Sequence, residues 1–299
     1  MPLPSPLPDD EAPLRCTRRA LLASAGAALS GPVLAQTPLV QPGEGYRFSP
    51  VPQQSIPLVA GYWNPILAWV SARSGVRLVL KISRTSAETT KYVLDQEVEF
   101  VFTNHLFSPD REALGWKVFG RRRMPPLHGQ IIVPAESPIT ELAQLDGREV
   151  VFPGPEAFVA YKVPYAHLLR QKVGARPIFG GNMDGAFAQL YAGKAAACGC
   201  NSQLAEAHAR RENRRYRALW SSEPFHDLAL MAAGKVPERD VRAVAAAFAA
   251  MHQDPKGQEV LAQVSQTVGL GVDAHFMASD GREYDAYRRF YQSAPAELR

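Results

Sequence analysis

The 299-residue sequence is poor in cysteine and lacks the short motifs that mark common enzyme classes. Its cysteines are Cys16, Cys198 and Cys200, too few for the disulfide framework of a small secreted scaffold. There is no Gly-x-Ser-x-Gly turn, no His-Glu-x-x-His helix and no glycine-rich phosphate loop. These absences argue against an enzyme and against a bound cofactor.

Long apolar runs are also missing, apart from one segment near the N-terminus. The pair Arg18-Arg19 precedes a small-residue apolar run, Ala20–Leu34, and Val33-Leu34-Ala35 offers a small-x-small cleavage pattern. The run is too short and too rich in Ala, Gly and Ser to predict a membrane span. We interpret residues 1–35 as a twin-arginine-like export signal, which predicts a soluble periplasmic protein. A leader that merely looks like a signal is the alternative.

The chain shows no strong excess of one charge. Its 33 Lys and Arg against 29 Asp and Glu give a formal net charge of +4. The arginine runs within 121–123 and 210–215 are predicted to lie on the solvated surface. No aromatic residues alternate with them, as a groove for single-stranded nucleic acid would require. A nucleic-acid partner is therefore not expected.

Apolar patterning predicts an α/β protein with two successive β-α-β-α-β runs and a helical tail, the rhythm of parallel sheets covered by helices. The first run has predicted strands over 48–51, 76–82 and 98–103 and helices over 58–71 and 86–95. The second has predicted strands over 130–134, 149–152, 177–180 and 196–200 and helices over 137–145, 161–172 and 184–192. The tail has predicted helices over 239–251, 258–264 and 279–291.

Several stretches, in order, resemble one family: the periplasmic phosphonate-, phosphite- and phosphate-binding proteins. Tyr92–Asn104 resembles the family's helix, turn and strand leading to the cleft, and His128–Val151 its crossing strand and Ser-Pro-Ile segment. Phe152–Pro164 lies where the family carries its ligand loop. The return segments and the late helix are similar at Gly180–Asn201, Trp220–Asp227 and Asp254–Leu261. The resemblance covers roughly residues 44 to 265, and the order of these individually weak motifs carries it.

This resemblance implies a two-lobed type 2 periplasmic-binding fold with a helical tail, which closes around a small solute by hinge motion. Lobe one would comprise residues 44–128 and 228–299, and lobe two residues 129–227. The hinge would lie near Leu127–Ile132 and Phe225–Leu230. The implied partner is the membrane permease of an ABC importer, and the implied state is a monomer. A periplasmic sensor docking on a membrane histidine kinase is the alternative.

The ligand loop departs from the family's pattern. Where the family carries Ser and Thr at a helix start, this sequence has Ala157, Phe158 and Val159, with Glu156 beside them. A carboxylate at that place would repel an anion at short range. We therefore expect an oxyanion that is held differently from phosphonate, or a thiophilic species.

The candidate site lies between the lobes in this interpretation. The residues predicted to contact ligand are Tyr62, Thr103, Asn104, His128, Glu156, Ala157, Phe158, Tyr161, Asn182, Cys200 and Asn201. For Asn182, Asp184 and Asn201 the alternative is turn or N-cap duty. His105 and His128 both fall at cleft-facing segments, and a structural role is the alternative for each.

The two remaining cysteines suggest a second chemistry. Cys198 and Cys200 stand at i and i+2 of a predicted strand and so point to one face, too far apart for an unstrained disulfide. Two such thiols, with His128 as a further ligand, could hold arsenite, Cu(I) or Zn(II). The alternative is that both are small buried residues beside Ala195–Ala197. On balance no metal site is predicted.

Overall fold

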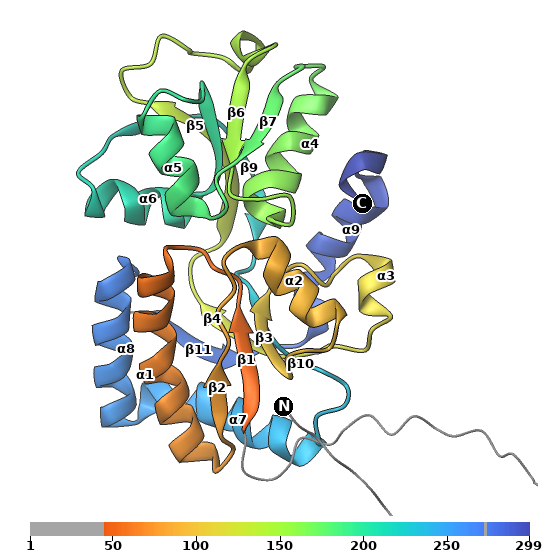
Figure 1. The fold of residues 1–299 in the computed structure, drawn as a ribbon, viewed down its shortest axis with the longest axis vertical. Coiled ribbons are helices and arrows are strands. Elements are labelled where there is room, and N and C mark those ends of the chain that lie inside the picture. Colours follow the sequence, from red (N-terminus) through yellow and green to blue (C-terminus); the bar gives the residue numbers. More distant parts are fainter. Residues whose placement is uncertain (1–44, 272–273) are drawn as a thin grey trace, which may run out of the picture. The chain divides into compact units, whose positions relative to one another are not determined.

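The computed structural model describes residues 45–271 and 274–299, so the predicted export signal over residues 1–35 lies outside the described residues. Two mixed sheets surrounded by helices make up the described chain, which confirms the predicted α/β class (Figure 1). The described residues belong to one compact unit. In the described residues no helix combines the length and the hydrophobicity needed to cross a bilayer.

The first sheet has six strands in the order β11-β4-β10-β3-β1-β2. Its strands are β1 (Tyr46–Pro50), β2 (Leu78–Leu80), β3 (Phe100–Thr103), β4 (Lys117–Arg123), β10 (Ala229–Ala232) and β11 (His275–Ala278). β1, β2 and β3 are parallel, as the β-α-β-α-β pattern predicts, whereas β10 runs antiparallel to β3 and β4. The neighbouring carboxyl ends of β1 and β3 therefore lie at one edge of this sheet.

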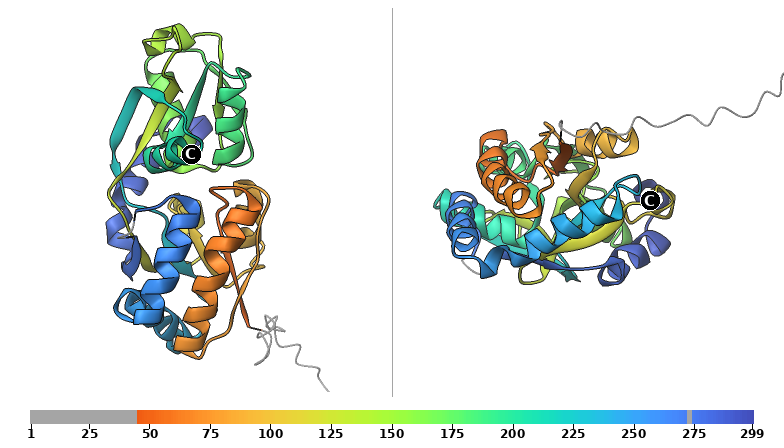
Figure 2. Two further views of the ribbon diagram at one scale, coloured as in Figure 1. Left: turned by 90° about the vertical axis from the view of Figure 1, so that its left-hand side faces the viewer. Right: turned by 90° about the horizontal axis from the view of Figure 1, so that it is seen from below.

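Helices α1 (Ile56–Ser74), α7 (Glu238–Ala250) and α8 (Pro255–Val268) pack together against this sheet, and α1 and α8 lie side by side (Figures 1 and 2). An aromatic core fills the interface, with the Phe48 and Trp63 rings 4.8 Å apart and the Trp63 and Phe102 rings 5.1 Å apart. α1 ends at Gly75, whose φ of 70° is left-handed, as its place after the apolar pattern predicts. The remaining helices of this half are α2 (Ser86–Leu94) and the single turn α3 (Pro109–Glu112).

The second sheet has five strands in the order β7-β6-β8-β5-β9. They are β5 (Leu127–Pro134), β6 (Glu149–Phe152), β7 (Arg176–Phe179), β8 (Ala197–Asn201) and β9 (Tyr216–Phe225). β6, β7 and β8 are parallel, but β5 runs antiparallel to both β8 and β9, so the purely parallel interpretation of the second run is wrong. β5 and β9 are the strands by which the chain enters and leaves this sheet, and they pair along their length in opposite directions.

Helices of the second half differ in part from prediction. The α-helices are α4 (Val163–Arg170), α5 (Met183–Tyr191) and α6 (Ser202–Arg211). Two shorter elements are the 3₁₀ helix η1 (Leu142–Leu145) and the π-helical turn η2 (Phe158–Lys162). The helix predicted over 137–145 is only η1, since Pro138 disfavours helical backbone in the residue before it. The helix predicted from Tyr161 begins earlier, at Phe158, and continues into α4.

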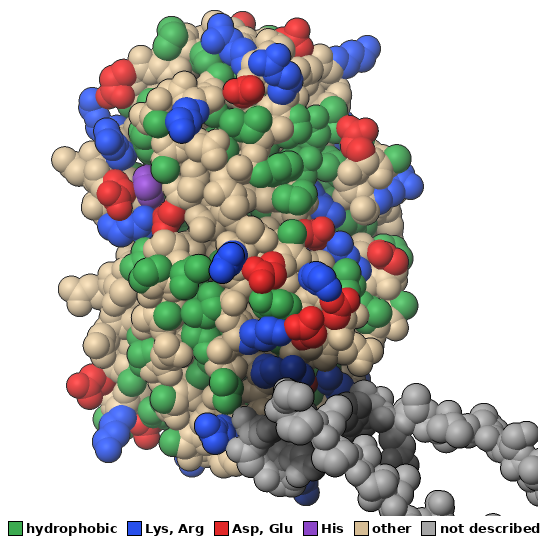
Figure 3. All heavy atoms as spheres, viewed as in Figure 1, with side chains coloured by type: hydrophobic (Ala, Val, Ile, Leu, Met, Phe, Trp, Pro, Cys, Tyr) green, Lys and Arg blue, Asp and Glu red, His purple; other side chains and the backbone are tan. Residues whose placement is uncertain are grey.

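Strands β4 and β9 escape the sequence patterns because they carry many polar residues. β4 reads KVFGRRR and β9 reads YRALWSSEPF, and neither shows clean apolar alternation. The expectation that the 121–123 run is solvated is wrong for Arg122, which is 5% exposed and bonded to Asp227 at 2.7 Å. β4 lies between β10 and β11, so alternate side chains of this strand point into packed structure. The arginines of 210–215 are exposed, and charges of both signs are interspersed on the face in Figure 3.

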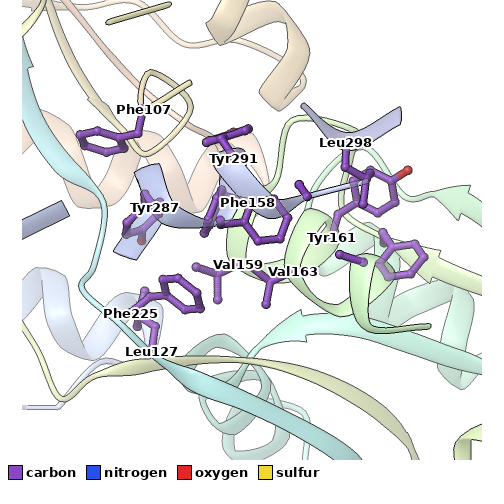
Figure 4. Packing of buried hydrophobic residues seen from close by; sticks show 14 of the residues in the cluster. Phe107, Leu127, Phe158, Val159, Tyr161, Val163, Phe225, Tyr287, Tyr291 and Leu298 are labelled. Carbon is purple, nitrogen blue, oxygen red and sulfur yellow. The ribbon is translucent and has the colours of Figure 1, made fainter. Parts of the chain in front are cut away.

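The C-terminal segment forms the expected closing helix. It consists of η4 (Gly281–Tyr284), α9 (Asp285–Ser293) and η5 (Ala296–Leu298). The buried side chains of α9 are aromatic, and they contact residues from both sheet segments, namely Phe107 after β3 and Phe158 after β6. We call this set the aromatic cluster: Phe107, Phe158, Phe225, Tyr284, Tyr287, Phe290 and Tyr291. Figure 4 labels five of them, Phe107, Phe158, Phe225, Tyr287 and Tyr291.

Candidate functional site

A small cavity of about 50 Å³ lies where strand ends of the two sheets meet. The first sheet contributes the segments that follow β1 and β3 and the start of α2, and the second contributes the segments after β6, β7 and β8. The polar side chains lining it are Gln53, Ser86, Asn104, His105, Asn182 and Asn201. No Lys, Arg, Asp or Glu is among its described lining residues, and most of the others are apolar.

Three helices begin at the cavity. Ser86 is the first residue of α2, and Asn182 and Asn201 are the N-caps of α5 and α6. The Asn182 Oδ1 accepts from the Gly185 backbone N–H at 2.8 Å, and the Asn201 Oδ1 accepts from the Gln203 N–H at 2.9 Å. Helix N-termini carry partial positive charge and unpaired N–H groups, which favour an anion. The N-cap duty expected as the alternative for both asparagines is therefore present, and both also line the cavity.

Ser86 is the polar group at the cavity whose bonding is least satisfied. Its side-chain oxygen is buried, with the residue 4% exposed, and has no hydrogen-bond partner in the described structure. Gly154, after β6, approaches it so closely that a Cβ there would lie 2.7 Å from the Ser86 Oγ. A hydroxyl buried without a partner is costly, and a polar ligand would supply one.

His105 lies beside Ser86 and is 2% exposed. Its Nδ1 is 2.9 Å from the Thr90 hydroxyl, which in turn donates to the Ser86 backbone carbonyl at 3.1 Å. Burial lowers the pKa of His105 to about 4, so the ring is neutral at neutral pH.

Two contacts between the sheet segments involve residues close in sequence to the cavity lining. In the first, the Arg111 guanidinium donates to both Glu156 carboxylate oxygens, at 2.5 and 3.2 Å. In the second, the Asp184 Oδ2 accepts from the Ser55 N–H at 2.9 Å. Burial raises the pKa of Glu156, but the bonds from Arg111 and nearby positive charges outweigh it and lower the pKa overall. Glu156 is thus ionised with its charge balanced, which removes the repulsion toward an anion expected from the sequence.

The cavity brings together about half of the predicted site residues. Those lining it are Asn104, Ala157, Phe158, Asn182 and Asn201. Glu156 is bonded to Arg111 and directly precedes the lining residue Ala157. Thr103 directly precedes the lining residue Asn104, and its Oγ1 accepts from the His105 N–H. Tyr62 lies behind, buried against Arg122. Tyr161 packs on Phe152 and Tyr165 instead.

The cysteines and His128 lie elsewhere. Cys198 and Cys200 are free, fully buried in an apolar cluster of the second half, and burial raises the pKa of both thiols. His128 lines a different, larger groove, and its Nδ1 is 2.8 Å from the Ser222 carbonyl. Among the described residues no three His, Cys, Asp or Glu side chains are grouped to hold a metal ion.

Phe158 has two roles in the segment Phe152–Pro164, which corresponds to the family's ligand loop. It contributes to the cavity wall, yet it is only 1% exposed and its ring packs 4.3 Å from Tyr287 and 5.3 Å from Phe225 (Figure 4). An aromatic anchor therefore occupies the position where the sequence comparison expects a hydroxyl.

Sequence reasoning missed Gln53, Ser86 and Arg111 and left His105 outside the predicted set. A signal for Ser86 exists, because a helix start directly after a parallel strand turns its N–H groups toward the carboxyl edge of the sheet. Arg111 carries no such signal, since its partner Glu156 is 45 residues away in sequence.

Known proteins with a similar sequence pattern or a similar fold include components of phosphonate ABC transporters. The family model for the periplasmic substrate-binding protein of phosphonate ABC transporters matches residues 48–273. The structure is similar to the binding protein component of an ABC phosphonate transporter from Pseudomonas aeruginosa (TM-score 0.70, 14% identity, 83% of this chain and 86% of that one). It is also similar to PhnD1 from Prochlorococcus marinus in complex with methylphosphonate (TM-score 0.69, 13% identity, 83% and 97% coverage).

A third similar structure is a Xanthomonas citri protein bound to ATP (TM-score 0.63, 15% identity, 85% and 96% coverage). No protein with a curated description matches the chain. At these identities the structural likeness bears on the fold alone, and it confirms the two-lobed type 2 periplasmic-binding fold.

Proposed function

Because this chain belongs to the family of periplasmic substrate-binding proteins of phosphonate ABC transporters, we propose that it binds a small phosphonate-like oxyanion in the cavity described above. The observation that carries the proposal is the convergence of three helix N-termini on a cavity with an unpartnered buried hydroxyl, Ser86. Such a site offers an anion N–H and O–H donors without a fixed cation.

Closure of two lobes around the ligand is part of the proposal. We assign lobe one to residues 44–128 and 228–299, lobe two to 129–227, and the hinge to Leu127–Ile132 and Phe225–Leu230. The division of the strands supports this assignment. All six strands of the first sheet fall in lobe one, and the strands of the second sheet fall in lobe two, except for the first two residues of β5. The C-terminal helix α9 contacts residues of both lobes.

Members of this family are periplasmic transport proteins, not enzymes, and work with the permease of an ABC transporter. The family match favours this importer role over the sensor role. We propose further that the chain is exported by the twin-arginine route and acts as a monomer. The Arg18-Arg19 pair before a weakly apolar run supports the export route.

The test is calorimetric titration of the purified protein with methylphosphonate. Ser86→Ala should weaken binding by about ten- to a hundredfold, the effect of one buried hydrogen bond to a charged group. It should leave the free energy of unfolding almost unchanged, because the Ser86 hydroxyl has no partner to lose. Ser265→Ala is the matched control, since Ser265 is also buried and unpartnered but lies on α8, outside the cavity lining.

Failure to bind methylphosphonate, phosphite or a small sulfonate at millimolar concentration would contradict the proposed ligand class. Wild-type affinity in Ser86→Ala would instead show that the ligand binds somewhere other than this cavity.

A further inference from the structure

The hydrogen bonds around His105 favour one position for the proton of its ring. A threonine hydroxyl has one proton to donate, and the Thr90 hydroxyl gives it to the Ser86 carbonyl at 3.1 Å. Toward the His105 Nδ1, 2.9 Å away, the Thr90 oxygen can then act only as an acceptor. The proton of the neutral ring therefore sits on Nδ1, and Nε2 carries a lone pair.

Neutrality of the ring follows from its surroundings. His105 is 2% exposed, and the charged groups that act on it are Glu156 after β6, Arg111 of α3 and Lys162 of η2. Burial lowers its pKa most; Glu156 raises the pKa, while Arg111 and Lys162 lower it. The outcome, about 4, leaves Nε2 unprotonated throughout the neutral range.

No described residue donates a hydrogen bond to Nε2, although His105 lines the cavity. A ligand that brings its own proton would give this nitrogen a donor. Ser86 and the helix N-termini, by contrast, can serve the unprotonated oxygens of the same ligand.

From this geometry we infer that the cavity selects a singly protonated oxyanion, one P–OH group of which donates to the His105 Nε2. This inference rests on the proposed function and deepens it. Hydrogen phosphonates and hydrogen phosphite have the required proton, whereas sulfonates and sulfate, fully ionised at neutral pH, have none. The absence of any lining cation agrees with a ligand of single charge, because a dianion is far costlier to bury.

The test compares methylphosphonate with methanesulfonate, which has the same shape and lacks the proton. Calorimetry at neutral pH should give affinity for methylphosphonate at least about tenfold tighter. Above the second pKa of methylphosphonate, its affinity should fall about tenfold per pH unit, because only the monoanion binds.

Two variants separate this inference from a merely structural histidine. Thr90→Val removes the acceptor that favours this tautomer, so Nε2 can carry the proton and the preference for methylphosphonate should shrink toward parity. His105→Gln, whose amide can donate, should do the same if Thr90→Val does not fold. Thr89→Val is the matched control, since the neighbouring Thr89 hydroxyl contacts Ser83 and not His105.

Equal affinity of the wild-type protein for both ligands would overturn the inference and leave the proposed function standing, as would a preference that survives in both variants. If neither ligand binds while an unrelated solute does, the proposed function falls with it.

Discussion

Single residues of this chain show how ionisable groups are held inside the protein. The Arg122 guanidinium is buried, bonded to Asp227 at 2.7 Å and to the Tyr62 hydroxyl at 3.2 Å. Burial alone would lower the pKa of Arg122, but the Asp227 charge and bond raise it, so the side chain stays charged. The pair joins β4 to Asp227, which lies within the proposed hinge segment Phe225–Leu230. Such a pair costs desolvation and fixes geometry rather than adding much stability.

His105 is the opposite case, a buried group that stays neutral. Its pKa of about 4 lies below the unfolded value of 6.5, so between these values the unfolded state binds more protons. The free energy of unfolding should therefore fall by about 2 kcal/mol between pH 7 and pH 5, and the loss should be complete only below pH 4. Urea denaturation of wild type and His105→Gln at both pH values measures this difference. An unchanged pH slope in the variant would show that other groups cause the loss.

At the scale of elements, the aromatic cluster joins the C-terminal helix to the loop that follows β6. Phe158 begins η2 and packs against Tyr287, Phe290 and Tyr291 of α9, and Figure 4 shows its ring near Tyr287 and Tyr291. Phe107 stacks on Tyr284 at 4.5 Å. α9 presents its aromatic residues on one face, and that face is the buried one. The cavity wall at Phe158 is thus held from behind by the tail of the chain.

Phe158→Ala should lower the free energy of unfolding by about 3–5 kcal/mol, because it leaves a void among rings that cannot all collapse into it. Phe179→Ala is the control, since this β7 phenylalanine is 42% exposed and should cost much less. Denaturant titration of both variants gives the comparison. A small effect at Phe158, no larger than at Phe179, would mean that α9 is not anchored through this ring.

At the scale of the whole molecule, two contacts close in sequence to the cavity lining connect residues of different sheets. Arg111–Glu156 and Ser55–Asp184 each join a segment of the first sheet to one of the second. Asp184 also pairs with Arg211 at 2.7 Å, so its carboxylate is held from its own side as well. If the lobes open to release ligand, these contacts must break first.

Glu156→Gln should therefore raise the rate of methylphosphonate dissociation about three- to tenfold, since a neutral amide replaces one side of a charge-assisted bond. The association rate should change less, because it does not depend on breaking this pair. Stopped-flow measurements give both rates. Glu136→Gln is the control: Glu136 pairs with Arg215 at an exposed place, with 67% and 82% of the side chains accessible. Equal dissociation rates in the two variants would argue that closure does not involve Arg111–Glu156.

Features that depend on neighbouring residues could be predicted from the sequence, whereas features that depend on distant partners could not. The helix starting at Ser86, the strand Glu149–Phe152 and the Gly75 end of α1 come from local periodicity and capping, and the structure has them at those places. The strand pairing of β5 and the burial of Arg122 were wrongly predicted, because both depend on partners far along the chain. Cys198 and Cys200 lie on a β-strand as predicted, but only the neighbouring cluster decides that they face apolar side chains and not the cavity.

The sequence by itself determined the α/β class, the order of most elements and the membership of a binding-protein family, since these depend on local propensity and on the order of motifs. The tertiary structure alone decided which residues meet at the cavity. Ser86, His105 and Asn182 converge because strands of two sheets end there, and Glu156 is neutralised because α3 brings Arg111 to it. Charge balance and hydrogen-bond partners of this kind are set by distances in space, which spacing along the chain does not encode.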